Sequence, residues 1–221
     1  MSGKRNVIFA KNEIYHLFNR SNANESIFVK KKEITRSLNL MSFYRFNQSL
    51  RFSFFDRLPE EQKDKYLEKT LGNVPNVDIL SYSLMPNHFH LLIKQTNEKG
   101  IKNYLSNFQN SFAKYFNIKN KRFGTLFQRP FKAKHVESDE QLLHISRYIH
   151  LNPVTSYMME FENLRSSDLT SLQLYLDKKK SWVNTDLIIN LIGSVSKYEK
   201  FVKDHVDYQR KLSKIKHLLL D

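Results

Sequence analysis

A short apolar run that carries two histidines constrains the fold more than any other part of this sequence. Residues 85–93 read MPNHFHLLI, and beyond the proline they have the extended, apolar character of a β-strand. Side chains alternate between the two faces of a strand, so His88 and His90 are expected on one face and the apolar residues between them on the other. Two imidazoles on one face of a rigid strand form a candidate pair of ligands for a divalent metal ion.

Further along the chain, apolar spacing predicts an alternation of strands and helices. Residues 12–20 are rich in aromatic and branched side chains and predict a first strand, and 77–85 and 88–94 predict two strands, or one bent strand, interrupted at Pro86. A basic and aromatic strand or hairpin is expected at 124–136. Helical spacing is found at 30–50, 60–71, 101–116 and in the chain after 155.

The helix that follows the basic strand has recognisable start and stop signals. Ser138, with Gln141 three residues later, has the form of a capping box. Pro153 disfavours helical geometry in the residue before it, so the helix is expected to end near Asn152.

This order of elements fits an α+β fold of the ferredoxin-like or RRM-like kind, with an antiparallel sheet, helices on one face and a C-terminal helical extension. We expect a catalytic domain at 1–155 and a basic, helical extension at 156–221. Trp182, the one tryptophan of the chain, is expected to anchor the extension.

The charge balance narrows the class of partner. Among 221 residues, 36 Lys and Arg stand against 22 Asp and Glu, a net charge of +14 that favours a polyanion such as nucleic acid. The chain has no cysteine, which excludes disulfides and thiolate metal sites. Neither a signal peptide nor a membrane-spanning run is visible, so a cytoplasmic protein without a membrane partner is expected.

Two side chains on the capped helix can complete a site with the histidines. Tyr148 and Asn152 are four residues apart and therefore share a helical face. The Asn152 carbonyl oxygen suits a hard cation such as Mg²⁺ or Mn²⁺, and the Tyr148 phenol becomes a nucleophile when it loses its proton. Tyr115 is a rival nucleophile, but it falls in the apolar stripe of residues 101–116, which favours core packing. His16 follows the first strand and is another side chain that can approach the same face.

The two motifs together resemble a known family. Residues 85–92 (MPNHFHLL), followed by 147–154 (RYIHLNPV), are similar to the HUH single-tyrosine transposases, and most of all to the REP-associated tyrosine transposase branch. The likeness extends over roughly residues 12–155. It implies that His88 and His90 bind the metal, that Tyr148 is the catalytic nucleophile, and that Asn152 occupies the place of the third polar ligand.

The resemblance also implies a reaction and a substrate. Tyr148 would attack single-stranded DNA beside a hairpin, giving a 5′-phosphotyrosine and a free 3′-hydroxyl, with Mg²⁺ or Mn²⁺ and no nucleotide cofactor. Basic residues near aromatic rings suit phosphates and unpaired bases. The residues expected to bind nucleic acid are Lys119, Lys121, Arg122, Phe127, Arg129, Lys132 and Lys134.

Two other functions remain open at this stage. One is a domesticated module that binds hairpin DNA or RNA without turnover, and the other is a metal-dependent phosphodiesterase that uses water, in which Tyr148 is dispensable. Monomer and homodimer are both compatible with the sequence.

Overall fold

A four-stranded antiparallel sheet forms the centre of the computed structural model, which describes residues 7–177 and 181–211. Its strands lie in the order β2 (Val77–Met85), β3 (His88–Gln95), β1 (Ile14–Arg20) and β4 (Lys132–Val136). Strands β2 and β3 form the hairpin that turns at Pro86 and Asn87, and β1 lies between β3 and β4. This order confirms the predicted α+β class.

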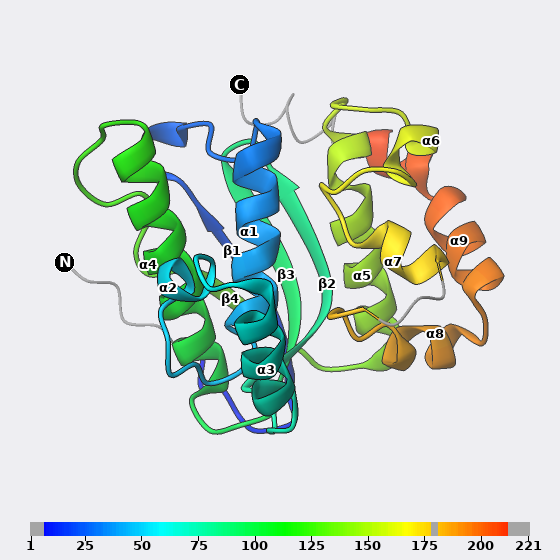
Figure 1. Cartoon of the computed structure of the whole chain (residues 1–221). Helices are drawn as coiled ribbons and strands as arrows, with labels where there is room; N and C mark the ends of the chain where they lie inside the picture. Colours follow the sequence, from blue (N-terminus) through cyan, green and yellow to red (C-terminus); the bar gives the residue numbers. More distant parts are fainter. Residues whose placement is uncertain (1–6, 178–180, 212–221) are drawn as a thin grey trace.

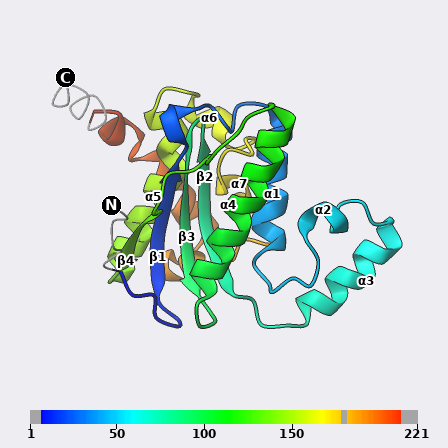
Figure 2. The ribbon, with the colours of Figure 1, turned by 90° about the vertical axis from the view of Figure 1, so that its left-hand side faces the viewer.

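Helices cover both faces of the sheet, whereas the sequence predicted helices on one face only (Figures 1 and 2). On one face, α1 (Lys31–Phe43) packs beside α4 (Gly100–Lys119), and Phe89 of β3 meets Phe108 of α4 with ring centroids 5.4 Å apart. On the other face, α5 (Asp139–Thr155) packs along β2 and β3. Alternation along β3 therefore sends the phenylalanine into the main core and the histidines toward α5.

Between α1 and β2 the chain forms an arm on the side of the sheet that α1 and α4 cover. It comprises α2 (Phe52–Phe55) and α3 (Glu60–Leu71), whose bounds agree with the helix expected at 60–71. Figure 2 shows the arm reaching away from the sheet beyond α1. A single turn of 3-10 helix, η1 (Asn22–Asn24), follows β1.

The start of α5 agrees with its predicted signal and its end does not. The Gln141 backbone N–H donates to Ser138 Oγ at 3.1 Å, as expected for a capped first turn. The predicted end near Asn152 is wrong, because the helix continues through Pro153 to Thr155. The Ser156 N–H still donates to the Asn152 carbonyl at 3.0 Å, so the proline removes one donor without stopping the helix.

The basic segment before α5 is only partly a strand. Pairing with β1 is restricted to β4, and the residues before it form a loop that includes an isolated bridge between Ser21 and Phe127. The expected strand or hairpin over 124–136 is therefore shortened to its last five residues.

The C-terminal extension closes the outer edge of β2. Its helices are α6 (Phe161–Leu164), α7 (Leu172–Leu176), α8 (Asp186–Ile192) and α9 (Val195–Lys203), of which α6, α8 and α9 contact α5. The Leu84 N–H donates to the Leu169 carbonyl at 2.7 Å, and Trp182 stacks on Tyr82 with ring centroids 5.5 Å apart. Trp182 thus anchors the extension as predicted, whereas residues 212–221 of the predicted basic extension lie outside the described residues.

Within residues 7–177 and 181–211, every helix is too short or too polar to cross a bilayer.

Candidate active site

The two histidines of β3 lie on the sheet face that α5 covers. Their ring centroids are 5.2 Å apart. His88 Nδ1 is 2.7 Å from Asn87 Oδ1, and His90 Nδ1 is 2.9 Å from His16 Nε2. The Nδ1–H of His88 donates to the amide oxygen of Asn87, which leaves the Nε2 lone pair for a further ligand. The Nε2 of His90 is available in the same way in the tautomer whose Nδ1–H donates to His16.

Both imidazoles are held in the neutral form. Burial, with a smaller contribution from Arg20, lowers the pKa of His88 to about 4. Burial also lowers the pKa of His90 well below its usual value, assisted by His16, His88 and Arg20. At neutral pH these rings therefore carry lone pairs and no charge, which is the state that binds a metal ion.

Helix α5 brings Tyr148 to the same place. The ring stands edge-on to His90 with centroids 5.7 Å apart, and it is 6.2 Å from the ring of His16. The side chain is partly accessible, since 38% of the residue's surface is exposed. Burial of the remainder raises the pKa of Tyr148, so its phenol is protonated at neutral pH.

These side chains line one cavity of about 540 Å³ between the sheet and α5. The motif residues His88, His90 and Tyr148, which are far apart in the sequence, thus meet at one cavity. The lining residues are Phe18, Asn19, Arg20, Asn24, His88, His90, Gln128, Lys132 and Tyr148.

Asn152 is placed differently from the other three motif residues. It lies one turn beyond Tyr148 on α5 and is 6% exposed, but it does not line the cavity. Its amide nitrogen is buried and has no hydrogen-bond partner among the described residues. Its role as the third ligand therefore stays a prediction.

The donor set fits a divalent ion in part. The two neutral imidazoles are suitable ligands, and Asn24 and Gln128 bring amide groups to the same cavity. Over the described residues, His, Cys, Asp and Glu form no group of three or more that is able to hold a metal. Asn24 and Gln128 are therefore the candidate oxygen donors beside the histidines within the described part of the chain.

Strand β1 supplies three cavity-side residues that the motifs did not identify as site residues. His16, Phe18 and Arg20 alternate along the strand, and Phe18 and Arg20 are register partners of His90 and His88. Burial, with a smaller contribution from Lys134, lowers the pKa of His16 to about 4. The two-residue spacing of these three residues, which is the same as that of His88 and His90, could be seen in the sequence. Only the pairing of β1 with β3 shows that these side chains lie beside the histidines.

The residues expected to bind nucleic acid divide into separate groups. Lys132 lines the cavity, and Lys134 is the register partner of His16 on the neighbouring strand. Lys119 and Arg122 instead form ion pairs with Glu33 and Glu25, each at 2.5 Å. Lys121 and Arg129 are exposed.

The aromatic member of that set occupies a different environment from the one expected. Phe127 is 5% exposed and packs against Phe89 and Phe112, so its ring belongs to the core. Phe123, nearby in the same segment, is 94% exposed and is the ring accessible to an unpaired base.

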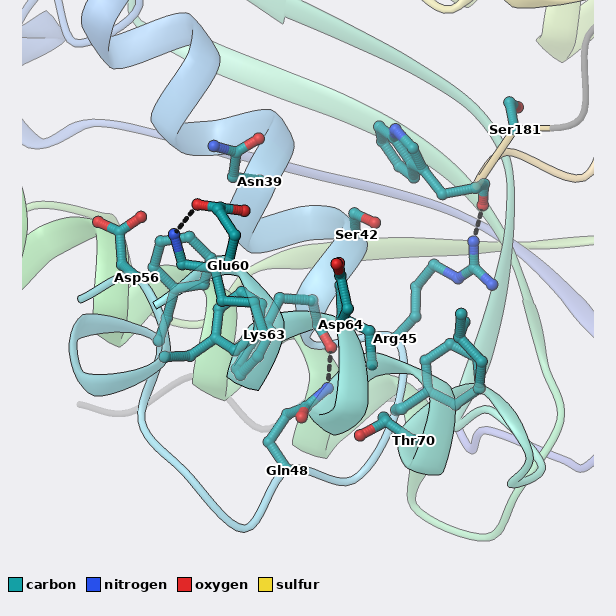
Figure 3. Close-up of a pocket in the computed structure, with 17 residues that line it drawn as sticks. Asn39, Ser42, Arg45, Gln48, Asp56, Glu60, Lys63, Asp64, Thr70 and Ser181 are labelled. Atoms are coloured by element: carbon teal, nitrogen blue, oxygen red, sulfur yellow. Dashed lines mark hydrogen bonds and ion pairs between the residues drawn. The ribbon is translucent and has the colours of Figure 1, made fainter. Parts of the chain in front are cut away.

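The rival nucleophile lies far from the histidines. Tyr115 sits on α4, on the opposite face of the sheet, where its hydroxyl is 3.3 Å from Lys119 Nζ. A larger cavity of about 710 Å³, between α1, the α2–α3 arm and Trp182, is also separate from the histidine site (Figure 3).

Comparisons with known proteins give one family model and two solved structures that resemble this chain. Residues 46–152 match the family model described as IS200-like transposase. A REP-associated tyrosine transposase bound to a REP hairpin shares the fold with a TM-score of 0.56 at 10% identity, covering 83% of this chain and 94% of that one. A transposase-like protein from Deinococcus radiodurans gives a TM-score of 0.37 at 14% identity, over 67% and 95% of the two chains. No curated protein matches the chain.

Proposed function

We propose that this chain is an IS200-like transposase that cuts and rejoins single-stranded DNA beside a hairpin by means of a 5′-phosphotyrosine on Tyr148. The observation that carries the proposal is the meeting of Tyr148 with His88 and His90 at one cavity. A nucleophile on one element and two neutral imidazoles on another are the parts that such a reaction requires.

The tyrosine performs the covalent step. Because its phenol is protonated at neutral pH, attack removes that proton as the bond between Oη and phosphorus forms. The bond from phosphorus to the 3′-oxygen breaks at the same time, and this oxygen takes up a proton. Reverse attack by a 3′-hydroxyl restores the phenol and a phosphodiester, so the reaction needs no nucleotide cofactor.

The remaining cavity residues bind and orient the strand. Lys132 is the register partner of Phe18 on β4, and Arg20 lies two residues beyond Phe18 along β1, so both are positioned to hold phosphates near the scissile one. Gln128 presents an amide for base edges or backbone oxygens.

His88 and His90 are the residues that would hold Mg²⁺ or Mn²⁺. When bound, the ion supplies positive charge for the oxygens of the scissile phosphate. Asn152, one turn beyond Tyr148 on the same helix, is the proposed third ligand.

The substrate proposed is hairpin DNA with a single-stranded flank. The +14 net charge supports a DNA partner, and the structurally similar transposase is one bound to a REP hairpin. Since Tyr148 and the histidines of one chain already meet, a monomer is sufficient for the reaction, and a homodimer is not required.

The test is a covalent adduct assay with an end-labelled hairpin that carries a single-stranded flank, in the presence of Mn²⁺. Wild-type protein is expected to yield a labelled protein–DNA band on a denaturing gel, and Tyr148→Phe to abolish it. Tyr115→Phe is the matched control, because it removes the rival phenol on the far face and is expected to leave the band unchanged.

Other outcomes contradict the proposal in distinct ways. Cleavage that survives in Tyr148→Phe indicates a hydrolase that uses water. Hairpin binding with neither adduct nor cleavage in wild type indicates a binding module.

A further inference from the structure

Helix α5, which carries Tyr148, is joined to the sheet through a buried histidine that the proposed reaction does not use. His150 is fully buried, two residues beyond Tyr148, with a neighbour on each ring nitrogen. Its Nε2 lies 2.8 Å from Ser171 Oγ, and its Nδ1 lies 2.8 Å from Tyr198 Oη. Both partners come from the C-terminal extension.

The neighbouring contacts fix the direction of these hydrogen bonds. The Tyr198 hydroxyl donates to Ser146 Oγ at 3.0 Å, so it accepts from His150 Nδ1–H. The opposite ring atom, Nε2, then accepts from Ser171 Oγ, which itself accepts the Tyr82 backbone N–H at 3.0 Å. This assigns the Nδ1–H tautomer of His150 from the network.

Together the bonds form a continuous chain in a single direction. It begins at the backbone of β2 and passes through the extension, into α5, back to the extension through Tyr198, and again into α5. The chain ends where Ser146 Oγ donates to the Leu143 carbonyl at 2.8 Å. Every hydroxyl and ring nitrogen on the path has a partner, which a buried polar network needs if it is to hold one geometry.

A second contact fastens the same turn of the helix. The guanidinium of Arg147, the residue before Tyr148, lies 4.0 Å from the ring centroid of Phe201 in α9 and donates to the Phe201 carbonyl at 3.4 Å. Residues 146, 147 and 150 thus attach to the extension, while Tyr148 faces the cavity on the other side.

We propose that His150 is a positioning residue, and that the hydrogen-bonded chain from Tyr82 through Ser171, His150 and Tyr198 to Ser146 holds Tyr148 in register with the histidines. This rests on the proposed function of Tyr148. The C-terminal extension therefore acts as part of the catalytic framework, although it contributes no side chain to the cavity. Burial lowers the pKa of His150 to about 3, which keeps the ring in the neutral form that the chain requires.

The experiment compares two tyrosine variants that lose one buried hydroxyl each. Tyr198→Phe interrupts the chain. Tyr175→Phe is the matched control: its ring stacks on Tyr198 with centroids 4.8 Å apart, but its hydroxyl donates to the Leu80 carbonyl outside the chain. Both changes are expected to lower the melting temperature similarly.

Their effects on the reaction are expected to differ. In single-turnover assays with the labelled hairpin, Tyr198→Phe should slow adduct formation about tenfold or more, because small misplacements of a reacting group are costly. Tyr175→Phe should react at the wild-type rate, and both variants should bind the hairpin as wild type does. His150→Asn retains a donor near the position of Nδ1 and should recover part of the rate lost in His150→Leu.

Two further measurements distinguish a loosened α5 from an extension that has come away from the sheet. Fluorescence of the sole tryptophan, Trp182, reports whether the extension stays docked on Tyr82. Amide hydrogen exchange should accelerate in residues 146–152 of Tyr198→Phe and not of Tyr175→Phe.

Equal rates and equal exchange in the two tyrosine variants overturn the positioning role, as does a loss of rate that only follows melting temperature. If wild type forms no adduct, the proposed function fails, and the exchange comparison still decides whether the chain of hydrogen bonds holds α5.

Discussion

At the scale of single residues, the role of a side chain depends more on the groups that it contacts than on its residue type. The histidine pair and Tyr148 were predicted from strand alternation and helical spacing, and the structure brings them to one cavity. Phe127 was expected near nucleic acid because of its basic neighbours, but local composition cannot show which aromatic ring turns into the core. The contacts of His150 could not be predicted from the sequence, because its partners lie 21 and 48 residues away along the chain.

Buried neutral histidines make the stability of the fold dependent on pH. The pKa values of His16 and His88 fall to about 4 in the folded chain, below the usual value of 6.5 that applies after unfolding. Above pH 6.5 both states are neutral at these sites. Between pH 6.5 and about 4 the unfolded chain binds protons that the folded chain does not, so stability is lost as the pH falls.

We therefore predict a lower free energy of unfolding at pH 4.5 than at pH 7, measured by urea denaturation. His16→Gln removes one of the responsible groups and should show a smaller difference between the two pH values. An equal difference in wild type and His16→Gln would show that His16 does not contribute.

The ends of individual helices and strands were only partly predicted from local sequence features. The bounds of α3 and the start of α5 agree with the sequence, because charged spacing and a serine cap are local features. The predicted end of α5 was wrong. A proline weakens a helix locally, but packing of Leu151 and Val154 in the core favours continuation of the helix. The loop before β4 was not distinguished from a strand, since only pairing with β1 limits β4 to five residues.

The cap of α5 provides a prediction at this scale. Ser138→Ala removes the acceptor for the Gln141 N–H and should lower the free energy of unfolding by about 1 kcal/mol in chemical denaturation. Ser138→Thr keeps a hydroxyl and should lose less. An unchanged midpoint in the alanine variant would mean that water replaces the cap without cost.

At the scale of the whole molecule, positive charge is distributed unevenly, with some cations beside the cavity and others paired with carboxylates. The net charge was available from composition, but not which cations lie beside the cavity and which are neutralised by Glu33 or Glu25. That division depends on α1 packing beside α4 and on β4 pairing with β1, both of which are contacts between distant parts of the chain.

Salt dependence of DNA binding tests this division. If Lys132 contacts a phosphate, Lys132→Gln should reduce the slope of log binding constant against log salt concentration by about 0.7 for a single strand. Lys119→Gln is the control, because its ammonium pairs with Glu33 away from the cavity, and the slope should stay at the wild-type value. Equal reductions would place the strand on both faces of the sheet.

The covered edge of β2 also limits how two copies of this chain can associate. Along that edge, backbone groups of Ile79, Tyr82 and Leu84 already bond to residues 169, 171 and 184 of the same chain. A second copy therefore cannot extend the sheet there by adding a strand, because the donors and acceptors it needs are taken. If the protein self-associates through strand addition, the joined sheet must grow from the β4 side, with the two β2 strands at its outermost ends.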